Sequence, residues 1–311
     1  MIEIVAHSGA MRETVRVASR VAVTDANVLV TGESGAGKDA LARFIHERSK
    51  RSRAGLVKID CAALPAELLE AELFGYERGA FTGAVEARPG RLEAAHRGTL
   101  VLDEIAHLST DAQAKLLRVI ERREFERLGG RRTIKVDARL LALTNVDLQT
   151  AVKRRSFRED LFYRLNVVHV HVPPLRERRE DIGELARQLL RLFAAKHGRA
   201  VNEISGEARS LLQEYEFPGN VRELANVLER AVIVANGERV EAADLPEPLR
   251  ASVTRQRSGG RQATLAELEA EYIKETLKAC RGNKSEAARL LGISRKNLYE
   301  KLARYKERDE G

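Results

Sequence analysis

Short apolar segments alternate with amphipathic helical patterns over the first 172 residues. Five strands are predicted, at residues 27–31, 55–60, 98–104, 139–145 and 166–172. Between them lie helical patterns such as residues 109–124, with Ser109 or Thr110 available as a cap. Apolar strands that alternate with helices are typical of a parallel sheet covered by helices. We therefore predict an α/β fold for residues 1–173.

Two prolines, Pro173 and Pro174, end the fifth strand. Residues 174–246 then show helical spacing without strand signals, so we predict a small all-helical subdomain. Residues 247–263 become polar, basic and glycine-containing, which predicts a flexible linker. Residues 264–311 return to helical patterns and are expected to form an independent small all-α domain.

Composition narrows the function only slightly. A chain of 311 residues with 32% charged positions is a multidomain globular protein. The net charge of +8 indicates a polyanionic partner, although soluble proteins without such a partner can also be basic. Cys61 and Cys280 lie far apart without a nearby histidine set, so we expect a reducing compartment and no structural zinc. No apolar run is long enough to cross a bilayer, which makes the cytoplasm the expected location and excludes a membrane partner.

The first strand leads into "TGESGAGKD", which has the spacing of a phosphate-binding loop. Its glycines let backbone N–H groups turn inward, the following helix adds its positive N-terminal dipole, and Lys38 neutralises phosphate charge. A turn that is merely rich in small residues would explain the composition but not the coincidence of strand, spacing, lysine and helix. The predicted nucleotide-binding residues are Gly32, Glu33, Ser34, Gly35, Ala36, Gly37, Lys38 and Asp39.

Asp39 stands where this motif usually has a serine or threonine that binds Mg²⁺, so the metal needs another ligand. The strand "GTLVLDE" delivers Asp103 and Glu104 to its carboxyl end, the sheet edge at which ligands bind. Asp103 suits Mg²⁺, and Glu104 suits polarisation of the attacking water. The alternative is that both carboxylates are solvated turn residues.

Two arginines, Arg158 and Arg164, lie in "SFREDLFYRLN". An arginine supplied by a neighbouring subunit can stabilise charge that develops on a γ-phosphate. The alternative for either arginine is a surface salt bridge to Glu159 or Asp160.

The segment "ELFGYERGAFTGA" places Phe81 among small residues that encode neither helix nor strand. Two interpretations of Phe81 are open. Its side chain is either exposed for contact with a partner protein or packed into the core of its own domain.

The motifs "GESGAGKD", "ELFGYERGAFTGA", "GTLVLDE", "FREDLFYRLN" and "FPGNVREL" resemble, in order, those of bacterial sigma-54-dependent transcriptional activators of the AAA+ ATPase class. The resemblance covers nearly the whole chain. It implies an ATPase that uses ATP and Mg²⁺, with Asp103 as metal ligand, a sensor at Asn145 and a second sensor at Arg222 on the helical lid. It also implies that Arg158 and Arg164 act in trans, which requires a ring of subunits, commonly a hexamer.

The resemblance answers the question that Phe81 raises. In this family the loop contacts sigma-54 of the RNA polymerase holoenzyme, so Phe81 and Thr82 are expected contact residues. The full loop comprises Gly79, Ala80, Phe81, Thr82, Gly83 and Ala84. The flanking glycines let it swing, and the aromatic ring supplies contact area at low entropic cost.

This sequence departs from the family pattern at two positions. Asp60 replaces an asparagine that is thought to restrain the catalytic glutamate, and a second carboxylate beside Glu104 would raise one pKa or weaken that restraint. We therefore expect Asp60 to influence catalysis. Phe217 replaces the usual tryptophan before "PGN", a mild change at an apolar position. Asp39 is no departure, because an acidic residue there is usual in the family.

The last 48 residues resemble a Fis-type helix-turn-helix domain. A capping box at Thr264 and Glu267 opens a helix whose apolar positions include Tyr272. Two shorter helices follow, capped by Asn283 and Ser294. The expected core comprises Ala287, Ala288, Leu291, Ile293, Leu298 and Leu302. The expected contacts with enhancer DNA are Lys284, Ser294, Arg295, Lys296, Asn297 and Glu300.

The favoured hypothesis is an activator that binds upstream DNA, hydrolyses ATP and remodels the sigma-54 polymerase closed complex into the open complex. One alternative is a DNA-binding AAA+ regulator in which ATP controls only oligomerisation, and another is a different AAA+ machine such as a helicase loader or unfoldase. The chain starts about thirty residues before the phosphate loop, so either a regulatory domain was removed or a separate regulatory protein controls it.

Overall fold

The computed structural model describes residues 4–257, 269, 272–273, 276–277, 280 and 283–309. The chain forms two compact units, residues 1–250 and 251–311. Each unit is described by itself below.

The first unit is built on a five-stranded, fully parallel sheet with the order β2-β5-β8-β1-β9. Its strands are β1 (Val28–Thr31), β2 (Leu56–Asp60), β5 (Thr99–Asp103), β8 (Arg139–Thr144) and β9 (Val168–His171). All five predicted strands are confirmed. This order brings the carboxyl ends of β5, β8 and β1 side by side, where the predicted phosphate and metal residues follow.

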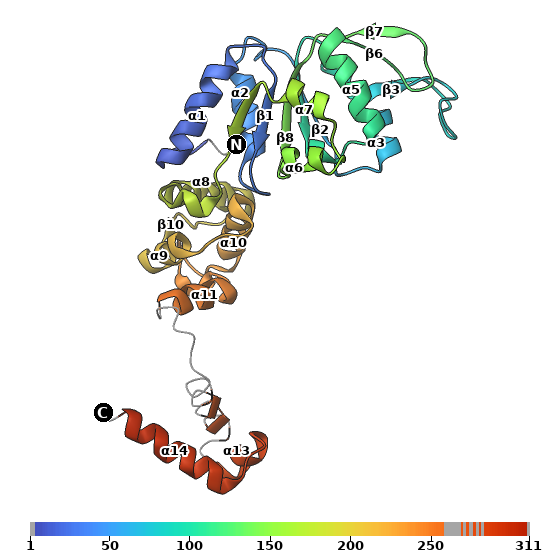
Figure 1. Ribbon diagram of the computed structural model, residues 1–311. Helices are drawn as coiled ribbons and strands as arrows, with labels where there is room; N and C mark the ends of the chain where they lie inside the picture. The colour runs from blue at the N-terminus through green and yellow to red at the C-terminus, as the bar shows by residue number, and fades with distance from the viewer. Residues whose placement is uncertain are drawn as a thin grey trace. The chain divides into compact units, whose positions relative to one another are not determined.

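Both faces of the sheet are buried, because alternate strand residues enter two different apolar clusters. Val30, Val101 and Leu141 pack under α1 (Gly9–Ala22) and α2 (Lys38–Glu47). Figure 1 shows these two helices on one side of the sheet. The other face is covered by α3 (Ala66–Phe74), α5 (Thr110–Arg122), α6 (Leu148–Lys153) and α7 (Glu159–Leu165). The predicted helix at 109–124 is thus α5, and the Ser109 hydroxyl caps it by accepting a hydrogen bond from the Ala112 N–H.

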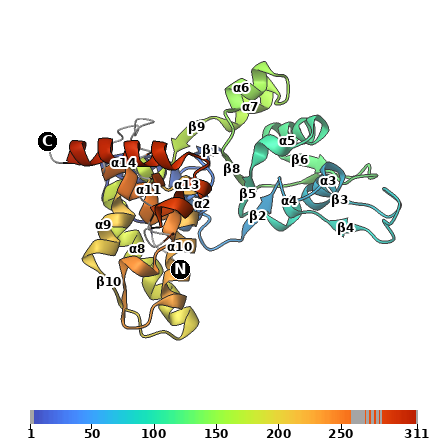
Figure 2. The same cartoon turned by 90° about the horizontal axis from the view of Figure 1, so that it is seen from below.

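Two hairpins interrupt this α/β arrangement. The first pairs β3 (Gly75–Tyr76) with β4 (Arg88–Pro89), and the second pairs β6 (Glu124–Glu126) with β7 (Thr133–Lys135). A bridge between Tyr76 and Leu128 joins them, and Figures 1 and 2 show them side by side. The short helix α4 (Arg91–Ala94) and the 3₁₀ turn η1 (Ile105–His107) complete this region.

The rest of the first unit is mainly helical. It contains η2 (Leu175–Glu177), α8 (Arg179–His197), α9 (Gly206–Glu214), α10 (Asn220–Val234) and η3 (Ala242–Asp244). A short parallel pair, β10 (Glu203–Ile204) with β11 (Arg239–Val240), shows that the expectation of a purely helical segment was wrong in this detail. Two-residue strands carry no periodic signal that the sequence could reveal.

Helix α11 (Glu247–Arg257) occupies the first part of the predicted linker. The prediction of a flexible linker is therefore wrong for residues 247–257, which form a helix in which Leu249 and Val253 are buried. Residues 258–263 lie outside the described part of the chain.

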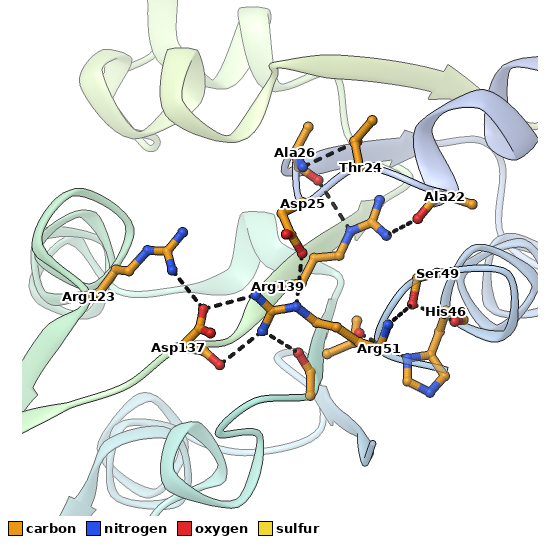
Figure 3. A network of polar contacts seen from close by, with 12 residues as sticks. Ala22, Thr24, Asp25, Ala26, His46, Ser49, Arg51, Arg123, Asp137 and Arg139 are labelled. Atoms are coloured by element: carbon orange, nitrogen blue, oxygen red, sulfur yellow. Dashed lines mark hydrogen bonds and ion pairs between the residues drawn. The ribbon is translucent and has the colours of Figure 1, made fainter. Parts of the chain in front are cut away.

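A buried arginine, Arg139, ties the start of β8 to the end of α1 (Figure 3). Its guanidinium donates to the carbonyls of Val21 and Ala22 at 2.7 and 2.8 Å. The neighbouring Arg51 bonds Asp25 and Asp137. Arg139 thus donates to carbonyls in the last turn of α1, and the two arginines together tie the segment after α1 to the start of β8.

The second unit contains α13 (Lys284–Leu290) and α14 (Arg295–Asp309). The expected caps are confirmed: Asn283 accepts hydrogen bonds from Ser285 and Glu286, and Ser294 accepts one from Asn297. The expected core is present, with Ile273, Leu277 and Cys280 added to it. Tyr272 is 63% exposed, so its assignment to the apolar face is wrong. The predicted capping box at Thr264 and Glu267 lies outside the described residues.

Candidate active site

The loop between β1 and α2 has the backbone that phosphate binding requires. Gly37 lies in the left-handed region at φ 103° and is the N-cap of α2, to which it contributes no side-chain hydrogen bond. Gly35 has φ 74°, and a Cβ there would lie 2.4 Å from the Gly219 carbonyl oxygen. The first-turn amides of α2 therefore have no capping side chain, and they point where an anion can bind.

The side chain of Lys38 is buried inside this loop. Its Nζ donates to the carbonyl oxygens of Gly32 at 2.9 Å and Glu33 at 3.3 Å. It also lies 3.5 Å from Oε1 of Glu104. The ammonium thus sits between the loop and the end of β5, as a group that neutralises phosphate charge must.

Asp103 and Glu104 occupy the carboxyl end of β5. Glu104 has φ 50°, an unusual backbone conformation for a non-glycine residue. Its Oε2 accepts a hydrogen bond of 3.1 Å from the backbone N–H of Asn145, which follows β8. The predicted catalytic glutamate and the predicted sensor are therefore in direct contact.

Asp60 ends β2 and is the register partner of Asp103 in the neighbouring strand. Its Oδ1 accepts a 2.9 Å hydrogen bond from the Ala62 N–H. Within the described residues it forms neither a hydrogen bond nor an ion pair with Glu104. Cys61 directly follows Asp60 and is buried. Its burial, and then the negative charges of Asp60, Asp103 and Glu104, raise the pKa of Cys61 to about 12. The carboxylates therefore form a negative group, while Asp60 itself turns toward its own loop.

Lys58 belongs to this site, although the sequence analysis did not select it. Its Nζ lies 2.5 Å from Oδ1 of Asp39 and 2.8 Å from Oδ2 of Asp103. Burial alone would lower the pKa of Lys58, but the hydrogen bonds to the two carboxylates outweigh it and raise that pKa. The sequence did contain one signal for Lys58. It lies two residues before Asp60, so both side chains are on the same face of their strand.

The donor set fits a magnesium ion. Asp103 presents carboxylate oxygens, the hard ligands that Mg²⁺ prefers, and the nearby Asp39 shares the Lys58 ammonium with it. Within the described residues, the structure contains no cluster of three or more His, Cys, Asp and Glu residues that could hold a metal by itself. A metal at this edge would therefore rely on phosphate oxygens and water for its remaining ligands.

The helical segment contacts the phosphate loop from the other side. Arg222 donates to the Ser34 hydroxyl at 2.9 Å. Arg176 binds the Glu33 carboxylate in a bidentate manner at 2.5 and 2.8 Å. Asn220 donates to the same carboxylate at 3.0 Å. These contacts lower the pKa of Glu33 to about 2, chiefly through Arg176 and then through Asn220. Arg176 and Asn220 were missed, because only the folded chain brings them to residue 33.

Two further links hold this segment against the core. The buried Arg178 donates to the Ala36 carbonyl of the phosphate loop. Asp181, which is fully buried, accepts hydrogen bonds from the backbone N–H groups of His7 and Ser8 and from the Ser8 hydroxyl. Phe217, at the position where the family has tryptophan, is buried and stacks edge-to-face on Tyr215 at 4.9 Å.

The two predicted finger arginines lie away from the phosphate loop of their own chain. Arg158 pairs with Asp160 at 2.8 Å, and Arg164 pairs with Glu121 at 3.1 Å. The salt bridge that was the alternative therefore exists for Arg158, whereas the partner of Arg164 was not foreseen. Within the described residues, neither arginine contacts residues 32–39.

The segment 79–84 forms a tight turn between β3 and β4, as its lack of helix and strand signals predicted. The N–H of Gly79 donates to the Ala84 carbonyl at 2.8 Å and closes the turn. Phe81 is 41% exposed and stacks edge-to-face on Tyr76 at 5.0 Å, so it lies outside the core. Thr82 is exposed as well, whereas Ala84 is buried.

The predicted DNA-binding residues lie at the starts of two helices in the second unit. Arg295, Lys296, Asn297 and Glu300 are exposed in the first turns of α14, and Ser294 precedes them. Lys284 starts α13, and its Nζ lies 4.7 Å from the centre of the Tyr299 ring.

Comparison with known families agrees with this geometry. The sigma-54 interaction domain matches residues 4–171, the AAA+ ATPase lid domain matches residues 176–262, and the bacterial regulatory protein Fis family matches residues 264–305. The chain belongs to the sigma-54-dependent transcriptional regulators. The AAA+ core, the lid and the Fis-type helix-turn-helix of this family together match most of the chain.

Several curated relatives of this regulator are closely similar. Regulatory protein AtoC of Escherichia coli is 47% identical over 97% of this chain and 67% of its own length. Transcriptional regulatory protein FlbD of Caulobacter vibrioides is 44% identical over 96% of this chain and 69% of its own length. The regulator thus spans about two thirds of the length of these relatives.

Solved structures give the same result. NtrX from Brucella abortus, crystallised in complex with ATP, matches with a TM-score of 0.76 and 36% identity over 97% of this chain and 69% of the NtrX chain. The Hsp104 machine matches with a TM-score of 0.55 and 18% identity over 72% of this chain and 44% of its own, which supports the fold alone. None of the helices within the described residues is long and apolar enough to span a membrane.

Proposed function

We propose that this regulator binds DNA upstream of its promoters, hydrolyses ATP in a subunit ring and uses that energy to open promoter complexes of sigma-54 RNA polymerase. One observation carries the proposal. A single α/β unit holds the groups of an ATP site and also presents Phe81 outside its core, on a turn with the family's contact sequence.

Each site residue has a role that its position supports. Bound MgATP supplies the γ-phosphate whose transfer to water releases the free energy. Lys38 and the amides of the glycine loop would bind phosphate oxygens, and Asp103 would hold the metal. Glu104 accepts the proton of the attacking water, while its hydrogen bond to Asn145 fixes its direction. Arg222 approaches the phosphates from the lid.

The finger arginines are proposed to act on the neighbouring subunit. Arg158 precedes the first turn of α7 and Arg164 lies in its last turn, each in an ion pair that water screens and that is therefore weak. Exchanging such a pair for a phosphate contact in a second subunit costs little. This role requires a ring, and we propose a hexamer.

The path from the ATP site to the loop runs through Glu70. Glu104 is followed by η1, and η1 leads to the N-cap of α5. Ser109 at this N-cap and Lys115 farther along α5 donate to the Glu70 carboxylate on α3 at 2.8 and 2.7 Å. Helix α3 continues directly into β3 and the turn that holds Phe81. A shift at Glu104 can therefore reach the loop through packed, hydrogen-bonded elements.

The competing proposal is a DNA-binding regulator in which ATP controls assembly alone. The two are separated by measuring sigma-54 binding in the presence of ADP and aluminium fluoride, by gel filtration. We expect the wild-type chain to retain sigma-54, Phe81→Ala to lose it and the neighbouring exposed control Val85→Ala to retain it. Hydrolysis of ATP without sigma-54 binding in any nucleotide state would favour the assembly-only regulator.

A further inference from the structure

Lys58 occupies the oxygen of Asp103 that a metal ion would use. Oδ1 of Asp103 accepts a hydrogen bond from the Glu104 backbone N–H at 3.1 Å. This leaves Oδ2 for a cation, and the Lys58 ammonium lies 2.8 Å from it. The Asp103 side chain is 14% exposed, so solvent screens this contact less than an ordinary surface pair.

An ammonium and a magnesium ion compete for this oxygen, because two positive charges so close together repel each other. Mg²⁺ binds carboxylate oxygens at about 2.1 Å and demands near-octahedral geometry. A positive charge about 3 Å from the same oxygen would repel the metal and block its hydration shell. We therefore expect Lys58 to withdraw from Oδ2 of Asp103 when a metal binds there.

Asp39 gives Lys58 a place to remain when it leaves. Its Oδ1 lies 2.5 Å from the same ammonium. Asp39 belongs to the first turn of α2, directly after Lys38 in the phosphate loop. A lysine between two carboxylates can release one and keep the other, and this exchange costs less than returning the whole side chain to water.

We propose that Lys58 is a positioning residue that competes with the metal ion for Asp103. Its ammonium neutralises Asp103 in the nucleotide-free chain and excludes free divalent cations. ATP brings phosphate oxygens that supply the missing ligands, so the metal enters together with the nucleotide. This inference rests on the proposed ATP site but not on sigma-54 contact.

The test measures Mn²⁺ binding to the nucleotide-free, full-length chain by electron paramagnetic resonance. Lys58→Gln removes the competing positive charge. A neighbouring cation changes the proton affinity of a carboxylate by at least about tenfold, and we expect a change of the same size for Mn²⁺, so that the Kd of Lys58→Gln falls at least about tenfold below the wild-type value. Lys58→Arg keeps the charge and is expected to bind Mn²⁺ as weakly as wild type. Lys50→Gln, which removes an exposed lysine elsewhere, is the matched control.

A double variant assigns the effect to Asp103. Adding Asp103→Asn to Lys58→Gln is expected to remove the gain in Mn²⁺ affinity. The proposal is overturned if Lys58→Gln binds Mn²⁺ no more tightly than wild type, or if the gain persists in the double variant. It is also overturned if Lys58→Arg binds Mn²⁺ as tightly as Lys58→Gln. Circular dichroism checks that each variant folds, and should Lys58→Gln fail to fold, Lys58→Met replaces it under the same criteria. Because neither hydrolysis nor sigma-54 is used, the proposed function could fail while this result stands.

Discussion

The carboxylate of Glu104 accepts a hydrogen bond from the backbone N–H of Asn145, and its other oxygen lies 3.5 Å from the ammonium of Lys38. The contact joins residues at the ends of β5 and β8 to the loop after β1. These are neighbouring strands of the sheet, so the proposed phosphate-binding lysine and the proposed catalytic glutamate lie within a few ångströms of each other.

Glu104→Gln should retain nucleotide binding and lose hydrolysis. Glutamine keeps an oxygen for the Asn145 N–H but cannot accept the proton of water, so we expect a loss of about 100-fold or more in single-turnover hydrolysis. Binding of a fluorescent ATP analogue should be unchanged. Glu207→Gln, an exposed change on α9, is the control. Normal hydrolysis by Glu104→Gln would remove this residue from the mechanism.

Finger action in trans predicts complementation between inactive chains. Arg164→Ala and Glu104→Gln should each lose hydrolysis, the former by about 1,000-fold, the low end for an arginine finger. A mixture should regain part of the activity, because some interfaces then pair an intact Arg164 with an intact Glu104. Arg154→Ala removes a neighbouring exposed arginine and should remain active. If mixing restores nothing, Arg164 acts within its own chain or not at all.

The Glu33 contact predicts an acid-sensitive attachment of the lid. Arg176 and Asn220 lower the pKa of Glu33 from 4.5 to about 2. Because the folded value lies below the unfolded one, the stabilisation is complete above about pH 4.5 and is lost as the pH falls toward 2. Glu33 is 41% exposed, so after screening the contribution is about 1 kcal/mol.

Urea unfolding at a series of pH values checks this. Glu33→Gln should be less stable than wild type at pH 6, and the difference should shrink below pH 4. A difference that stays constant over this pH range would show that the ionisation of Glu33 does not contribute.

Arg139 and Arg123 should differ sharply in their effect on stability. Arg139→Ala removes a buried guanidinium and the hydrogen bonds that it donates to the carbonyls of Val21 and Ala22, at a cost of about 3 kcal/mol in the free energy of unfolding. Arg123→Ala breaks only an exposed pair with Asp137 and should cost less than about 1 kcal/mol. Equal effects would contradict the structural role given to Arg139.

The sequence predicted what periodicity and short motifs encode. All five strands of the sheet were found because each is an apolar run bounded by turn signals. The β3–β4 and β6–β7 hairpins were missed, since their strands have two or three residues and show no period. Helix α11 was misassigned because its basic, polar composition outweighed two buried apolar positions.

The site residues that belong to sequence motifs were predictable, and those outside the motifs were not. The phosphate loop, Asp103 and Glu104 were selected because their residue types imply their chemistry. Lys58 and Arg176 were not selected, because nothing in the local sequence distinguishes them from other basic residues. Only the folded chain brings Lys58 to Asp103 and Arg176 to Glu33. The effect of Asp60 was expected at Glu104, yet its carboxylate caps its own loop.

The central claim is that ATP hydrolysis reaches sigma-54 through the exposed turn. The most direct test measures open-complex formation by sigma-54 RNA polymerase on a promoter with a genome-derived upstream site. We predict that wild type opens the promoter with ATP, that Thr82→Ala hydrolyses ATP without opening it, and that Glu104→Gln does neither. A wild-type chain that hydrolyses ATP and binds DNA but never opens the promoter would contradict the claim.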